Sequence, residues 1–183
     1  MGNLVVKNSR VIQTRMRLTR YLKPPQIQLE LATRTPDEIP ENWSREQFIW
    51  SVKGKVLREL AALFERSGKI VNRRKFETDL ENRERKATTA IGGGIAIPHV
   101  RTMQARGFTM CFARSTPGVE FGSLDGTPVH FFFGVVAPPY EDKLYLEVYK
   151  RIATVFGAAE VRRGLSEASD EHEIIRILAR FGE

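Results

Sequence analysis

Hydrophobic residues recur every three to four positions in several segments of this chain, which is the spacing of a helix with one buried face. The clearest segment begins at Ser44, where Ser44 and Gln47 form a capping-box signature, and ends close to Gly68. We therefore expect a long amphipathic helix here. Its predicted buried stripe consists of Phe48, Val52, Val56, Leu60, Leu63 and Phe64.

The same periodicity predicts further helices, each with its own apolar anchors. They are a polar helix of about residues 72–84 with Phe76 and Leu80; a helix with Leu144, Val148, Ile152 and Val155 that Gly157 stops; a short helical turn around Val161; and a final helix capped at Ser169 or Asp170, with Ile174, Ile177 and Leu178.

Three other segments have the patterns of strands. Residues 27–31 alternate between apolar and polar side chains after a Pro-Pro turn. Residues 108–114 and 129–136 are continuous apolar runs bounded by turn residues, which suits strands that are covered on both faces. Helix and strand signals alternate along the chain, so we expect an α/β fold with helices on both faces of a central sheet.

Composition agrees with a single domain. The 183 residues are 42% hydrophobic, enough for one sizeable core, and no run approaches the ~20 apolar residues of a membrane span. The first residues lack the apolar centre and cleavage site of a signal peptide, so a cytoplasmic location is expected.

The net charge of +7 is concentrated near the N-terminus, where residues 1–35 hold seven Lys and Arg and only one acidic residue, Glu30. Such an arm could contact nucleic acid, an anionic membrane surface or an acidic protein. It has no regular amphipathic pattern and no interleaved aromatics, which favours a solvated or locally docked extension over residues 1–17. Nucleic-acid binding is the last-ranked of these hypotheses.

The candidate chemistry lies in the segment from Thr89 to His99, where three glycines lead into an apolar strand that ends on a histidine. An imidazole titrates near pH ~6.5, so at neutral pH it is mostly an unprotonated nucleophile that can hold a phosphoryl group. Phosphoryl transfer needs positive charge and hydrogen-bond donors around the group. Arg83 and the hydroxyls of Thr88 and Thr89 are close in sequence, and the glycines let backbone amides approach.

Packing and zinc binding are two other interpretations of the histidines. A lone histidine beside an apolar run is more often packed or solvated than functional. The three histidines, His99, His130 and His172, do not have the paired spacing of zinc ligands, so we expect neither a metal site nor a cofactor.

The string T-A-I-G-G-G-I-A-I-P-H at residues 89–99 resembles the phosphorylation-site motif of the fructose/mannitol (type 2) class of IIA proteins in the bacterial sugar phosphotransferase system. The resemblance extends from about residue 18 to the C-terminus, with an extra segment near residues 36–50. It implies a mixed central sheet, a phosphorylated histidine at His99 and an assisting arginine at Arg83. The family often has a second histidine where Lys143 stands here, and Lys143 is either a phosphate-binding replacement or an ordinary surface lysine.

The resemblance also implies a function. His99 is expected to accept a phosphoryl group from the phosphohistidine of the small carrier protein HPr, which would make the chain a phosphohistidine phosphotransferase component. The changed second position and the basic arm favour the nitrogen-regulatory branch, with a regulatory protein as the downstream partner. The alternatives are a sugar-specific transport component that serves a sugar permease, and a regulatory binding module of the same fold that is not phosphorylated.

Overall fold

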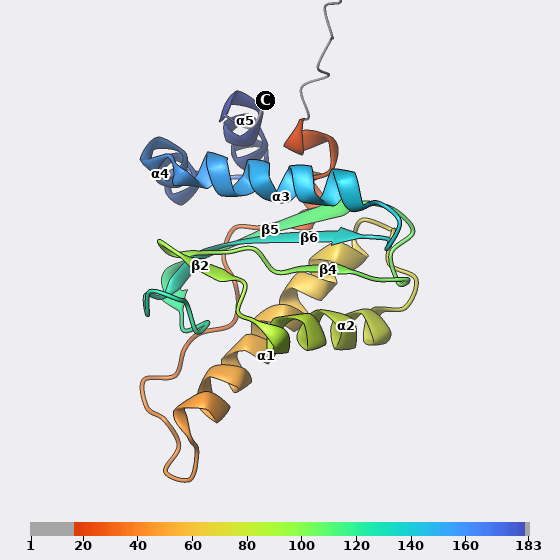
Figure 1. Cartoon of the computed structure of the whole chain (residues 1–183). Helices are drawn as coiled ribbons and strands as arrows, with labels where there is room; N and C mark the ends of the chain where they lie inside the picture. The colour runs from red at the N-terminus through yellow and green to blue at the C-terminus, as the bar shows by residue number, and fades with distance from the viewer. Residues whose placement is uncertain (1–16, 182–183) are drawn as a thin grey trace, which may run out of the picture.

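The computed structural model describes residues 17–181 (Figure 1). Apart from Arg17, the basic extension predicted for residues 1–17 lies outside this range, and so does its proposed contact with nucleic acid or an acidic partner. The described residues form a sheet with helices on both sides. No helix among them is long and apolar enough to cross a membrane.

The sheet has six strands in the described part of the chain, in the order β1-β5-β6-β3-β2, with β4 also paired to β6. Strands β5 and β6 are antiparallel neighbours, whereas β3 and β4 run parallel to β6 and β1 runs parallel to β5. The sheet is therefore mixed, as expected. The strands are β1 (Ile27–Gln28), β2 (Ala90–Gly92), β3 (Ile95–Ala96), β4 (His99–Arg101), β5 (Thr109–Val119) and β6 (Val129–Ala137).

The helices cover the two faces of the sheet, with two helices below it and three above it in Figure 1. Each layer encloses its own cluster of buried apolar residues, and β6 contributes to both clusters. This arrangement confirms the predicted α/β class. The lower helices are α1 (Arg45–Glu65) and α2 (Arg73–Lys86), and the upper ones are α3 (Asp142–Gly157), α4 (Ala159–Glu167) and α5 (Glu171–Phe181).

The helix signals in the sequence match the observed caps. The Ser44 hydroxyl accepts from the Gln47 amide, the Gln47 side chain accepts from the Ser44 amide, and the predicted stripe of α1 is buried. Asp170 accepts from the amide of Glu173 at the start of α5. The short turn predicted around Val161 is a nine-residue helix, α4, because Val161 and Leu165 together bury one face of it.

Two stretches before α1 differ from what the hydrophobic pattern predicts. The strand predicted for residues 27–31 has ladder pairs only at Ile27 and Gln28. Beyond them the carbonyl of Leu29 accepts from the Arg114 side chain, and the amide of Leu31 donates to the Arg114 carbonyl. Residues 31–44 then form an irregular loop that extends below the sheet in Figure 1. The segment noted near residues 36–50 comprises the end of this loop and the first turns of α1.

Candidate functional site

His99 is delivered by a short strand of its own. The sequence predicted one strand that ends on the histidine, and this detail is wrong: β3 stops at Ala96, and His99 is the first residue of β4. Pro98 separates the two strands because it has no N–H to donate to the ladder. Its carbonyl still accepts from the Val135 amide of β6 at 2.9 Å, so the chain stays beside β6 and His99 pairs with Val135.

The hydrogen bonds of His99 fix which ring nitrogen carries the proton. Nδ1 lies 2.6 Å from the carbonyl oxygen of Ile97. A carbonyl can only accept, so Nδ1 is the protonated nitrogen and, in the neutral ring, Nε2 holds the free lone pair. Nε2 faces the Arg83 guanidinium, with 2.7 Å between Nη2 and Nε2. The nucleophilic atom and the predicted assisting arginine therefore meet directly.

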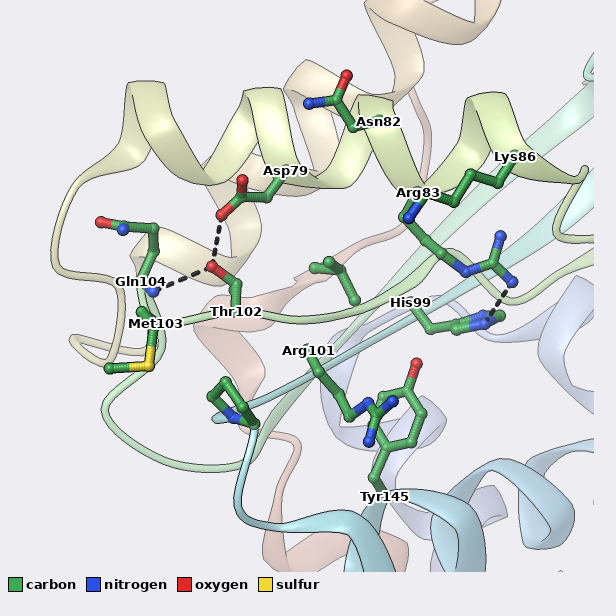
Figure 2. Close-up of a pocket in the computed structure, with 12 residues that line it drawn as sticks. Asp79, Asn82, Arg83, Lys86, His99, Arg101, Thr102, Met103, Gln104 and Tyr145 are labelled. Atoms are coloured by element: carbon green, nitrogen blue, oxygen red, sulfur yellow. Dashed lines mark hydrogen bonds between the residues drawn. The ribbon is translucent and has the colours of Figure 1, made fainter.

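Arg83 reaches the histidine from the last turn of α2, where it also donates to the carbonyl of Ala87 at 3.0 Å. Asp79, Asn82 and Lys86 lie on the same face of this helix, since residues three and four apart are neighbours on a helix surface. All four line one cavity together with His99 (Figure 2).

The end of α2 is held by a buried polar cluster behind the site. Glu84 accepts hydrogen bonds from the Lys53 ammonium at 2.6 Å and from the Thr89 hydroxyl at 2.6 Å. Lys53 also donates to the Thr88 hydroxyl at 3.1 Å. The side chains of Lys53 and Glu84 are only 5% and 1% exposed. This cluster fixes the residue next to Arg83 and ties it to α1 and to the start of β2.

Helix α3 supplies two tyrosines that the sequence analysis missed. The Tyr145 and Tyr149 rings lie edge-on to the His99 imidazole, with ring centroids 5.9 and 5.0 Å away. In Figure 2 the Tyr145 hydroxyl points toward His99, and burial raises the pKa of Tyr145 to about 12. Their spacing of four residues, which places them on one face of the predicted helix, was the available signal.

The cavity beside His99 is strongly basic. It has a volume of about 770 Å³, and its wall carries the cations Arg83, Lys86 and Arg101 against a single carboxylate, Asp79. Arg101 comes from β4, two residues after His99. A cavity with three cations and an imidazole suits an anion with several oxygens, such as a phosphoryl group.

The surroundings of His99 lower its pKa below the ordinary 6.5. Burial is the largest cause, because it penalises the charged ring, and the positive charge of Arg83 adds to it. The hydrogen bond to Ile97 and the charge of Glu84 act in the opposite direction. The imidazole is therefore held neutral, with Nε2 free to act as a nucleophile at neutral pH.

The structure brings together His99 and Arg83 but leaves the other predicted phosphate ligands outside the wall of this cavity. The hydroxyls of Thr88 and Thr89 are engaged by Lys53 and Glu84. Lys143 is exposed on α3. Phosphate binding by these three residues stays a prediction from the sequence.

The glycine run was expected to let backbone amides approach the phosphoryl group, but it forms a turn outside the wall of the cavity. Gly92, Gly93 and Gly94 have φ values of +95°, +62° and +76°; Gly92 ends β2, and Gly93 and Gly94 form the tight turn into β3. The amide of Gly93 donates to the Asp125 carboxylate at 2.8 Å, which pins this turn to the loop between β5 and β6. Within residues 17–181, no three His, Cys, Asp or Glu side chains lie close enough together to hold a metal ion.

Comparison with known proteins connects this fold and site to one family. The family model described as "Phosphoenolpyruvate-dependent sugar phosphotransferase system, EIIA 2" matches residues 43–181. The fructose-specific EIIABC component of Bacillus subtilis is 36% identical over 126 residues, which are 69% of this chain but only 20% of that protein. A nitrogen regulatory protein of Bradyrhizobium diazoefficiens is 33% identical over 127 residues, 69% of this chain and 82% of that protein.

A solved structure gives the same result for the fold. The crystal structure of the nitrogen regulatory protein IIA-Ntr from Neisseria meningitidis aligns with a TM-score of 0.72 at 25% identity, covering 88% of this chain and 98% of that chain. The fold and the site thus define an α/β domain in which a histidine and an arginine meet in the wall of a basic cavity. The chain belongs to the EIIA type 2 family of the phosphoenolpyruvate-dependent sugar phosphotransferase system.

Proposed function

We propose that this protein is a phosphocarrier whose His99 accepts a phosphoryl group from the phosphohistidine of an HPr-like protein. One observation carries the proposal: the bond from Nδ1 to the Ile97 carbonyl leaves the lone pair on Nε2, which faces Arg83 at 2.7 Å in the wall of a basic cavity. Membership of the EIIA type 2 family supports the same conclusion.

In the proposed step the lone pair of Nε2 attacks phosphorus, the new P–N bond forms, and the P–N bond to the imidazole of the donor breaks. No proton has to leave Nε2, because the proton of the neutral ring resides on Nδ1. As charge spreads over the three equatorial oxygens, Arg83 moves from the ring nitrogen to these oxygens and stabilises them. The donor imidazole regains its lone pair.

We further propose that the phosphorylated state serves nitrogen regulation and that the downstream partner is a regulatory protein in the cytoplasm. The nitrogen regulatory relative is matched over most of its length, which supports this choice. The fructose-specific relative supports the second candidate, a transport component that passes the phosphoryl group toward a sugar permease. A fructose IIB domain distinguishes the two, because only a transport component should transfer its label to that domain rapidly.

The direct test is phosphorylation of the full chain by ³²P-labelled, phosphorylated HPr. We expect acid-labile, alkali-stable label on the wild-type chain and none on His99→Ala. His172→Gln is the matched control, because His172 is exposed on α5 and should leave the labelling unchanged. If the folded wild-type chain takes no label where another family member does, the phosphocarrier proposal fails, and a binding module that is not phosphorylated becomes the better interpretation.

A further inference from the structure

Arg101 enters the same cavity as His99 and on the same side of β4 (Figure 2). Alternate residues of a strand point to the same face, and a rise of about 3.3 Å per residue places the two Cα atoms roughly 7 Å apart. An arginine side chain is long enough to bend back over that distance. In Figure 2, Arg83 lies above the imidazole, and Arg101 lies to the lower left of it, against the Tyr145 ring.

The ion pair and the aromatic contact of Arg101 leave other N–H donors of its guanidinium available. Its guanidinium pairs with the carboxylate of Asp142, the first residue of α3, and lies 5.8 Å from the centre of the Tyr145 ring. The side chains of Arg101 and Asp142 are 49% and 58% exposed, and an ion pair this open to water is weak. Arg101 therefore lines the same cavity as the reacting nitrogen and is easily released from Asp142.

A phosphoryl group on Nε2 would be a stronger ligand for Arg101 than Asp142 is. It brings more negative charge than one carboxylate and three acceptor oxygens, and the planar guanidinium can bind two of these oxygens at once. Arg83 approaches only from α2. On the side that faces α3, the aromatic neighbours of His99 are Tyr145 and Tyr149, which offer only neutral hydroxyls as donors.

We propose that Arg101 is a second phosphate-binding residue, which leaves Asp142 and binds the phosphoryl oxygens when His99 is phosphorylated. This inference rests on the proposed phosphorylation of His99 and adds the residue that completes its site. Arg101 then does what the sequence analysis assigned to Lys143, from the strand instead of the helix. The exchange also frees the Asp142 carboxylate, so phosphorylation changes the charge at the exposed start of α3.

Phosphoramidate, a small phosphoryl donor, tests the role without a docked protein. Phosphorylation of the full chain is followed by ³¹P NMR, and the lifetime of the phosphohistidine is measured after the donor is removed. For Arg101→Gln we expect phosphorylation at least about 10-fold slower than in the wild type, since it loses a charged donor to the transferred group. Arg101→Lys should recover part of the rate. Asp142→Asn should phosphorylate about 2- to 5-fold faster, because the competing weak ion pair is gone.

Arg45→Gln is the matched control. It also removes an arginine from an exposed ion pair, with Glu120, but Arg45 does not line the cavity, so the rate should not change. Thermal unfolding of each variant identifies any loss of fold, and Arg101→Lys provides a milder change if Arg101→Gln does not fold.

The amide resonance of Asp142 gives a readout that does not depend on rate. It should shift on phosphorylation of the wild type, because Arg101 departs, and should not shift by the same amount in Arg101→Gln. If the wild type takes label and Arg101→Gln takes it equally fast with equal lifetime, this inference alone is overturned. If the wild type takes no label from phosphoramidate or from phosphorylated HPr, the proposed function fails and this inference fails with it.

Discussion

The guanidinium of Arg83 lies 2.7 Å from Nε2 of His99, although the two residues are sixteen positions apart in the sequence. After α2 the chain turns through the β2–β3 hairpin. Strands β3 and β4 then run beside β6, so that β4 begins next to the last turn of α2. A permanently charged arginine at this distance opposes protonation of the ring. The same contact places a donor where charge would develop during the proposed transfer.

Replacement of Arg83 should slow the transfer strongly. We expect Arg83→Gln to lower the rate of phosphorylation by phosphorylated HPr by about 100-fold, since it removes one preorganised donor to the transferred group. Single-turnover quench measurements with labelled HPr give this rate. Arg74→Gln is the control, because Arg74 is an exposed arginine on the same helix outside the cavity. Equal rates for Arg83→Gln and the wild type would remove Arg83 from the mechanism.

His99 should remain neutral and reactive below pH 6.5. Its pKa is lowered in the folded protein, chiefly by burial, so an ordinary imidazole gains its proton at a higher pH than His99 does. ¹⁵N-edited NMR of the imidazole should show the Nδ1–H form persisting below pH 6.5, with the chain in urea as reference. In Arg83→Gln the pKa should rise but stay below 6.5, because burial, the larger cause, is kept. A pKa above 6.5 in the wild type would contradict the geometry.

The same shift links stability to pH. Below pH 6.5 the imidazole of His99 is protonated in the unfolded chain but still neutral in the folded chain. Protonation therefore favours the unfolded chain, and the free energy of unfolding decreases as the pH falls from 6.5 through the folded pKa of His99. Urea titrations at several pH values measure this slope. The slope should become smaller in His99→Gln, which cannot titrate at this position.

Breaking the buried Lys53–Glu84 pair should destabilise the fold. We expect Lys53→Met to lower the free energy of unfolding by about 3–5 kcal/mol, because it leaves the Glu84 carboxylate buried without its counter-charge. Removing the exposed pair between Arg45 and Glu120 by Arg45→Gln should cost no more than about 1 kcal/mol. Urea unfolding measures both. In the double variant Lys53→Met/Glu84→Gln the loss should be smaller than the sum of the single losses, and an additive result would contradict the coupling.

A methyl group at Gly134 should disturb the centre of the sheet. A Cβ there would lie 2.4 Å from Sγ of Cys111 and 2.4 Å from Cζ of Phe64, both in the core between the sheet and α1. We expect Gly134→Ala to lower the free energy of unfolding by at least about 1–3 kcal/mol. Gly157→Ala is the control, since a Cβ there meets nothing within 4 Å, and it should be neutral or stabilising by up to about 1 kcal/mol.

Replacement of Lys143 tests whether this residue binds phosphate or is an ordinary surface lysine. Its side chain is exposed and does not line the cavity, so Lys143→Ala should keep the rate of phosphorylation by phosphoramidate within about 2-fold of the wild type. A loss of tenfold or more would restore the phosphate-binding role predicted from its position. The measurement is the same ³¹P NMR time course.

Local signals in the sequence were sufficient for the helices and the long strands of this fold, but not for the short strands β2, β3 and β4. The capping box of Ser44 and Gln47, the apolar stripe of α1 and the continuous apolar runs of β5 and β6 depend on neighbouring residues and on burial, which the order of residues records. The motif that ends on His99 identified the candidate nucleophile, and the resemblance placed Arg83 beside it.

Contacts between distant segments could not be read in this way, and the tertiary structure decided them. Helices α2 and α3 pack on opposite sides of β4, and this packing decides three features of the site. They are the position of Thr88 and Thr89 behind it, the two tyrosines of α3 beside His99, and the partner of Arg101. Helix packing is set by shape and burial over the whole domain, not by local spacing. The sequence alone therefore determined the helices, the two long strands and the candidate histidine, whereas only the tertiary structure determined which cations surround it.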